Sequence, residues 1–193
     1  MMNYLAHAYL SFDEGDILLG NFIADTVKNK ASGYADKVRQ GIRLHHLIDN
    51  YTDDNLHFKK SISRLDLKYT PYGGVIVDIF YDHFLAANWQ RYHPLPLRNF
   101  VAKVYKIVLS KYHFLPLQMK LMFPHMMLTN WLLNYRDANN LRFYFRGLSY
   151  RTRNTYVIKD AAGELKKHYS SLNQDFFNFM NDMIPYVKSL SNY

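Results

Sequence analysis

Residues 75–85 form an apolar run that is interrupted by two carboxylates and an imidazole, Asp78, Asp82 and His83. In an α-helix, Asp78 and Asp82 lie one turn apart on the same face. Ionised carboxylates are costly in apolar surroundings unless something compensates their charge. A divalent cation does so, because it takes anionic oxygen ligands together with neutral imidazole. The alternative is that Asp78 faces solvent while Asp82 and His83 make one buried hydrogen bond.

A second helical segment repeats this pattern. His45, Asp49 and Asp53 follow one another at i, i+4 and i+8, which predicts a single stripe of one His and two carboxylates. Asp25 and His7 also stand among apolar residues. One such Asp is explained by a helix cap or a satisfied core polar group. Several of them, together with His residues, favour a shared polyvalent cation, so the sequence predicts a metal site.

Apolar residues recur at helical spacing along most of the chain, and no β-type alternation of any length occurs. This pattern predicts one all-α domain over residues 1–193, folded as a helical bundle. The clearest helix breaker is Thr70-Pro71-Tyr72-Gly73-Gly74, and the Asp78/Asp82 helix is expected to start just after it. The other expected helices cover about 15–29, 35–56, 97–111, 116–136, 138–148 and 154–190. We expect the last of these to be interrupted, with a kink at Pro185.

The composition is typical of a globular protein without thiol chemistry. Hydrophobic residues make up 49% and aromatic residues 17% of the 193 positions, which is enough for a packed core. The absence of Cys excludes disulfides, Cys-ligated zinc and thiol catalysis. No stretch approaches the roughly 18 consecutive apolar residues of a membrane span, and the N-terminus does not resemble a signal peptide. We therefore expect a cytoplasmic protein without membrane insertion.

The chain carries a formal net charge of +8, which indicates either solubility alone or an anionic partner. It has no long basic run and no recognisable RNA- or DNA-binding motif, so a nucleic-acid partner is not expected. The basic residues of interest form three groups, Lys59, Lys60, Arg64 and Lys68, then Arg142, Arg146, Arg151 and Arg153, then Lys166 and Lys167. Lys59, Lys60 and Arg64 closely follow the His45 helix and are the expected docking face for such a partner. The alternative is a solvated helix face without a partner, and residues 142–153 are the next candidate.

Four blocks of sequence occur in a fixed order. The first is Asn3-Tyr4-Leu5-Ala6-His7 with Leu19-Gly20-Asn21 and Ala24-Asp25, and the second is Gly41-Ile42 with His45, Ile48-Asp49 and Thr52-Asp53. The third is Asp78 with Asp82-His83-Phe84-Leu85 and Trp89, and the fourth is Trp131-Leu132-Leu133-Asn134-Tyr135-Arg136. Together, these blocks resemble the acyl carrier protein phosphodiesterase family from residue 3 to about residue 136. The remainder is similar in length and helical character only.

The resemblance implies an all-helical fold related to the HD-type metal-dependent phosphohydrolases. It also implies a divalent metal, with manganese favoured over magnesium or iron, and hydrolysis of a phosphodiester. The reaction of the family removes the 4′-phosphopantetheine arm from holo-acyl carrier protein and returns the apo form, a step within fatty acid biosynthesis and lipid metabolism. The implied partner is an acyl carrier protein, and a dispersed basic surface suits such a strongly acidic protein.

Individual roles follow from this expectation. The predicted metal ligands are Asp25, His45, Asp49, Asp78 and Asp82. We expect His83 or His7 to protonate the serine oxygen that leaves the carrier. Arg136 has a planar fork that suits a non-bridging phosphate oxygen, with a structural pair to Asp137 or another carboxylate as the alternative.

The chain departs from the family pattern at two points. His46 and Leu47 stand where the family tends to place basic residues, and the adjacent His-Asp doublet of the HD superfamily does not occur. Two other functions suit the same residues. One is a metal-dependent phosphohydrolase acting on nucleotides, although no glycine-rich phosphate loop is present. The other is a non-catalytic basic helical protein in which the Asp/His cluster only ties helices together.

Overall fold

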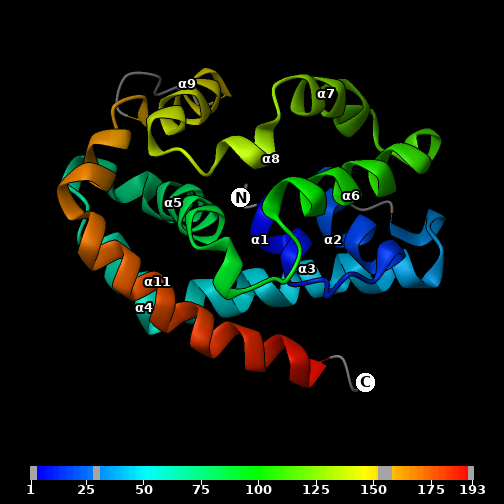
Figure 1. Ribbon diagram of the computed structural model, residues 1–193, viewed down its shortest axis with the longest axis horizontal. Helices are drawn as coiled ribbons and strands as arrows, with labels where there is room; N and C mark the ends of the chain where they lie inside the picture. The colour runs from blue at the N-terminus through cyan, green and yellow to red at the C-terminus, as the bar shows by residue number, and fades with distance from the viewer. Residues whose placement is uncertain (1–3, 28–30, 152–157, 191–193) are drawn as a thin grey trace. The chain divides into compact units, whose positions relative to one another are not determined.

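The computed structural model describes residues 4–27, 31–151 and 158–190, and every regular element in these ranges is a helix (Figure 1). The all-α prediction is therefore confirmed. Contacts divide the chain into two compact units, each built from segments that are far apart in sequence. The α1 unit comprises the described parts of Tyr4–Asp49 and Asn88–Asn134, and the α11 unit comprises Asn50–Ala87 and the described part of Tyr135–Tyr193. The expectation of a single domain stays a prediction.

The α1 unit joins the first helices to the middle of the chain. It contains α1 (Tyr4–Tyr9), α2 (Gly15–Val27), η1 (Ala31–Gly33), α3 (Asp36–Asp54) up to Asp49, η3 (Trp89–Arg91), α6 (Leu97–Ser110), η4 (Tyr112–Phe114), α7 (Leu117–Leu128) and α8 (Trp131–Asn134). Helix α2 packs against α1, α6 and α7, and α8 contacts both α6 and α7. The core of this unit therefore forms around α2.

Helices α2 and α3 cross at two glycines. A Cβ on Gly20 would overlap the carbonyl oxygen of Val38, and one on Gly41 would overlap the carbonyl oxygen of Ile17. Only glycine allows backbones to approach this closely. Because Asn21 follows Gly20 directly and His45 lies one turn after Gly41, the crossing brings this polar pair together.

The α11 unit is built around its longest helix. It contains α4 (Leu56–Ser63), η2 (Leu67–Tyr72), α5 (Gly73–Ala87), η5 (Ala138–Asn140), α9 (Leu141–Arg151) and α11 (Ala162–Leu190). Helix α11, orange to red in Figure 1, runs beside α4 and also contacts α5, α9 and η5. Its core is aromatic, because Tyr81 of α5 makes ring contacts with Phe58, Phe176 and Phe179.

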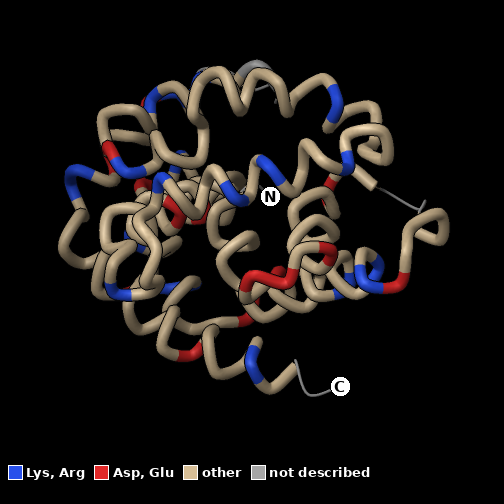
Figure 2. Tube along the Cα trace, turned by 45° about the vertical axis from the view of Figure 1, so that its right-hand side comes forward, with Lys and Arg blue, Asp and Glu red and all other residues tan. Residues whose placement is uncertain are grey.

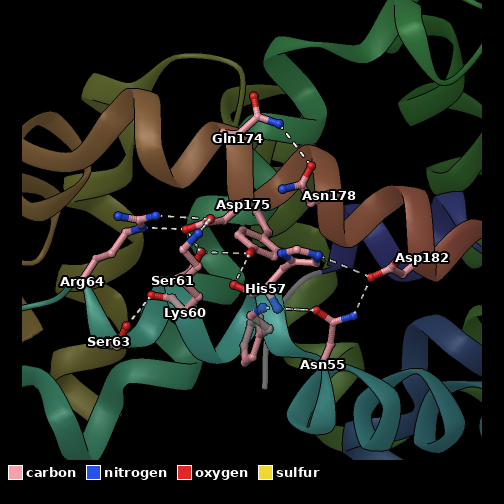
Figure 3. A network of polar contacts seen from close by, with 12 residues as sticks. Asn55, His57, Lys60, Ser61, Ser63, Arg64, Gln174, Asp175, Asn178 and Asp182 are labelled. Carbon is pink, nitrogen blue, oxygen red and sulfur yellow. Dashed lines mark hydrogen bonds and ion pairs between the residues drawn. The ribbon is translucent and has the colours of Figure 1, made fainter.

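A buried ion pair ties α4 to α11 (Figure 3). Asp175 of α11 is buried, and Arg64 Nε donates to its Oδ2 at 2.6 Å. The Ser61 hydroxyl donates to the same Oδ2 at 3.5 Å, and Lys60 Nζ lies 3.6 Å from Oδ1. Removing Arg64 alone would leave the charge of Asp175 in a buried position without its nearest partner, so we expect that substitution to destabilise the unit.

Three boundaries differ from the sequence-based prediction. The helix expected over 35–56 ends at Asp54, because Asn55 caps the separate helix α4 by accepting from the N–H of His57 at 2.8 Å. The helix expected over 116–136 is split into α7 and α8, with Asn130 left-handed between them at φ 47°. The break in the last helix lies at His168, whereas the backbone remains helical through Pro185. Residues 154–157 of that expected helix lie outside the described residues.

Lys and Arg residues, blue in Figure 2, are dispersed over the trace, as the sequence indicated. Within the described ranges, no helix combines the length and the apolar character that crossing a membrane requires.

Candidate metal centre

Helices α1, α2 and α3 bring four of the predicted site residues together. His45 Nε2 lies 3.2 Å from Asp25 Oδ1 and 3.3 Å from Asp49 Oδ2. His7 Nε2 lies 3.3 Å from Asp49 Oδ1, and the rings of His7 and His45 stack with centroids 4.0 Å apart. Ligand atoms of His7, His45 and Asp49 all lie within 4.8 Å of one another, which is a spacing that a metal ion can bridge. Asp53, predicted on the same stripe, is exposed and is not one of these grouped ligands.

The orientation of His45 is set by a backbone carbonyl. Its Nδ1 lies 3.0 Å from the carbonyl oxygen of Asn21. A carbonyl oxygen only accepts, so Nδ1 carries the proton, and in neutral His45 the lone pair of Nε2 then faces two carboxylates. A cation or a second proton has to stand between them. Metal-binding His residues have this arrangement, with one ring nitrogen donating to a backbone carbonyl and the other facing the ion.

The electrostatics of the metal-free cluster place a proton at that position. Burial opposes protonation of His45, but its hydrogen bonds to Asp25 and Asp49 outweigh burial and raise the pKa of His45 to about 9. Burial alone would raise the pKa of Asp49, yet its hydrogen bond with His45 and the close approach of the His7 ring hold that pKa well below its usual range. The pKa of Asp25 is lowered as well, since its bond to His45 outweighs burial. Burial and the charge of His45 lower the pKa of His7.

Unpartnered buried atoms show that the cluster fits a divalent cation. His7 is buried, and neither of its ring nitrogens makes a hydrogen bond of acceptable geometry with any described residue, although Nε2 is at ion-pair distance from Asp49. A buried nitrogen without a partner costs about 1–3 kcal/mol. Coordination of a cation by Nε2 would remove that cost. Two imidazoles with one or two carboxylates are a donor set for manganese, iron or zinc.

The other predicted site residues lie in the α11 unit. Asp78, Asp82 and His83 are all buried on α5, and Asp78 is only 3% exposed. The alternative in which Asp78 faces solvent is therefore wrong. His83 Nδ1 donates to the carbonyl oxygen of Tyr135 at 2.8 Å, and the Tyr169 hydroxyl lies 3.2 Å from Nε2. Burial lowers the pKa of His83, so that its imidazole is neutral near pH 7.

Arg136 is exposed in the same unit, directly after the buried Tyr135. The alternative of a structural pair with a carboxylate is not seen, because Arg136 makes no ion pair with any described residue. The Asp137 carboxylate instead accepts from the N–H of Asn139 at 2.9 Å. The same unit contains a hollow of about 160 Å³ with two basic side chains in its lining. The lining residues are Ala138, Asn139, Arg142, Ala162, Gly163 and Lys166.

Sequence reasoning missed the residues that orient the imidazoles. Asn21 donates through Nδ2 to the main-chain carbonyl of His7 at 2.9 Å and to the Ser11 hydroxyl at 3.0 Å. The main-chain carbonyl of Asn21 accepts a hydrogen bond from His45 Nδ1 at 3.0 Å. The sequence signal that could have identified Asn21 is an amide side chain next to a glycine in an otherwise apolar helix. No signal pointed to Tyr169, because it is far from His83 in sequence and comes close to it only through folding.

The fold and the site define a class: an all-helical protein with a candidate divalent-metal centre of the donor type that activates water in hydrolases. Residues 2–183 match the acyl carrier protein phosphodiesterase family, and the chain belongs to this family. The class is accordingly that of the phosphodiester hydrolases. The predicted resemblance is confirmed, and it covers nearly the whole chain rather than residues 3 to 136 alone. The relation to HD-type phosphohydrolases stays a prediction.

Relatives with the same name are similar over their whole length. The chain is 28% identical over 185 residues to an acyl carrier protein phosphodiesterase of Salmonella dublin, which covers 95% of this chain and 96% of the relative. The same identity and coverage hold for the proteins of that name from Salmonella paratyphi A and Salmonella agona. No solved structure matches the chain.

Proposed function

We propose that this protein hydrolyses the phosphodiester that links 4′-phosphopantetheine to a serine of holo-acyl carrier protein, with the help of a divalent cation. Membership of the family supports the reaction. The observation that carries the metal requirement is His45, whose Nδ1 is committed to a carbonyl while its Nε2 faces two carboxylates. Cytoplasmic location and a place in fatty acid biosynthesis are part of the same proposal.

The proposed ligands in the α1 unit are His45, Asp49, Asp25 and His7. His7 was expected to transfer a proton, but its stacking on His45 and its unpartnered ring nitrogens favour coordination. Asp78 and Asp82 remain predicted ligands that are tested separately. A bound cation would lower the pKa of a water molecule towards neutrality and offset charge on the phosphate oxygens. Manganese suits this mixed donor set best, with iron or magnesium as alternatives.

Two tasks remain for the side chains of the protein: transferring a proton from the attacking water to the departing serine oxygen, and binding the negatively charged phosphate group. Attack of water on phosphorus releases a proton, and the departing serine oxygen requires one. A neutral imidazole can take up the first and deliver the second. His83 suits this role, because burial keeps it neutral and its Nδ1 is fixed by the Tyr135 carbonyl. Arg136 is exposed, and its fork would hold a non-bridging phosphate oxygen.

The test is loss of the arm from the carrier. Purified protein is incubated with holo-acyl carrier protein and manganese, and the mass of the carrier is followed over time. We expect conversion to the apo mass with manganese, little with calcium, and none in excess chelator. A carrier that keeps its full mass with manganese contradicts the proposal, and cleavage of nucleotides in its place would point to a different substrate.

Matched variants connect the activity to the cluster. His45→Gln and Asp49→Asn should each lower turnover by at least about 100-fold, because each removes a metal ligand. His46→Gln is the control, since His46 is the exposed neighbour of His45. Asp78→Asn should abolish activity while keeping the helical fold. If it retains full turnover at saturating manganese, Asp78 is not a ligand.

A further inference from the structure

Helix α7 is apolar on both of its faces. Its inner face is lined by four buried residues, Met119, Met122, Phe123 and Met126. Its outer face exposes Leu117, Leu121 and Leu128, with exposed fractions of 73%, 74% and 84%. Their spacing places these three leucines on one side of the helix. A helix that is apolar all round is normally covered on all sides, so the outer face indicates a surface that binds something.

Two further apolar side chains are exposed on the elements that precede α7 in the chain. Phe114 of η4 is 69% exposed and Leu109 in the last turn of α6 is 52% exposed. Element η4 is held against α7, because the Tyr112 hydroxyl donates to the carbonyl of Lys120 at 3.1 Å. We call these five exposed side chains the α7 patch: Leu109, Phe114, Leu117, Leu121 and Leu128.

The segment that carries the α7 patch is basic throughout. Residues 88–134 contain six Lys or Arg and no Asp or Glu. Lys103 pairs with Asp13 at 2.9 Å, whereas Arg98 and Lys106 on α6 are exposed and make no ion pair with any described residue. An acidic partner would be attracted to this surface, and a second copy of a chain with net charge +8 would be repelled from it.

The basic residues that the sequence favoured for docking already form ion pairs with carboxylates of the α11 unit. Lys60 and Arg64 bind the buried Asp175 (Figure 3), and Lys59 pairs with Asp54 at 3.3 Å. A partner would have to compete with these pairs. Residues 142–153 were the next candidate docking face, and Arg153 of that segment lies outside the described residues.

We propose that the α7 patch, with Arg98 and Lys106 beside it in sequence, is the docking surface for the carrier-protein substrate. The partner is an acidic protein that presents apolar side chains within an acidic rim. This inference rests on the proposed function and deepens it. A protein is favoured over an anionic membrane because the relatives are named for action on a protein.

The test measures binding and hydrolysis separately. Affinity for fluorescently labelled holo-acyl carrier protein is measured at low and moderate salt. Leu117→Gln/Leu121→Gln should raise Kd by at least about tenfold, because it removes apolar contacts at the centre of the surface. Lys106→Glu should raise Kd mainly at low salt, because its contribution is electrostatic. Unchanged Kd in both variants overturns the proposal.

Controls use exposed residues of the same type in the α11 unit. Leu56→Gln/Leu67→Gln replaces leucines that are 73% and 89% exposed, and Lys188→Glu replaces an exposed lysine. Neither should change Kd. The patch variant should also hydrolyse a small phosphodiester, bis(4-nitrophenyl) phosphate, at the wild-type rate with manganese.

The outcomes distinguish the docking surface from the function. If the wild type cleaves the carrier and the patch variant cleaves it equally well, the docking surface is wrong and the function stands. If the wild type binds the carrier through the patch but does not cleave it, the function is wrong and the surface stands. Wild-type protein that ignores the carrier and sediments with anionic vesicles, or dimerises through the patch, overturns the docking proposal.

Discussion

His45 combines a fixed tautomer with an unusual charge state. Its pKa is raised to about 9 by Asp25 and Asp49 against the effect of burial, so metal-free protein carries a proton on His45 at pH 7.5. A cation on Nε2 has to displace that proton. We therefore expect metal binding at pH 7.5 to release about one proton, and apparent affinity to rise as pH increases towards 9. Calorimetric titration with manganese in two buffers of different protonation enthalpy measures the number released.

The matched comparison for this prediction is His45→Gln against His46→Gln. The first should abolish proton release together with most of the binding, and the second should leave both unchanged, because His46 is exposed. The direction of the pKa shift of His45 can be checked from the stability of the metal-free protein as a function of pH. Since the pKa of His45 is raised on folding, its contribution to stability is complete below about pH 6.5 and is lost as pH rises through about 9. Metal binding without proton release would show that Nε2 is not the ligand atom.

The crossing of α2 and α3 is the element that builds the centre. A methyl group on Gly20 or Gly41 would overlap backbone of the other helix, so the helices would have to separate. We expect Gly20→Ala and Gly41→Ala each to lower the free energy of unfolding by about 1–3 kcal/mol. Both should also weaken manganese binding, because the carbonyl of Asn21 would move away from His45. Urea unfolding monitored by circular dichroism, together with metal titration, measures the two effects.

Gly147 of α9 supplies the control, because a Cβ there meets nothing within 4 Å. Gly147→Ala should raise the free energy of unfolding by about 0.5–1 kcal/mol, since alanine is the better helix former. Equal effects at all three glycines would mean that helix propensity, and not the close approach, governs Gly20 and Gly41.

At the scale of the whole molecule, a cation that binds only the folded chain must stabilise it. At a manganese concentration of about 100 times Kd, the gain is about 2.7 kcal/mol. For a chain of 193 residues this corresponds to an increase in Tm of about 5–10 °C. Thermal unfolding with manganese and with excess chelator measures the difference.

Asp49→Asn removes a ligand, so its Tm should no longer depend on manganese. A wild-type Tm that is the same with manganese and with chelator would instead favour the alternative in which the cluster only ties helices together.

Features that depend on residues close together in the sequence were predicted better than features that depend on contacts in the folded structure. Helix positions such as α2 and α6 were predicted within a few residues, because apolar periodicity is a local property of the sequence. The boundary at Asn55 was missed, since a cap competes with the continuation of a helix and only the geometry resolves that competition. The kink expected at Pro185 is not seen there, and the break in the last helix lies at His168.

For the site, the sequence by itself determined which residue types were available: His and Asp at helical spacing in apolar surroundings, without Cys. Local spacing also brought His45 and Asp49 onto one face of α3. Only the tertiary structure decided that His7 stacks on His45, that Asn21 sets its tautomer, and that α7 keeps a second apolar face exposed. These are contacts between helices that are distant in sequence, and their geometry depends on packing such as the close approach of Gly20 and Gly41.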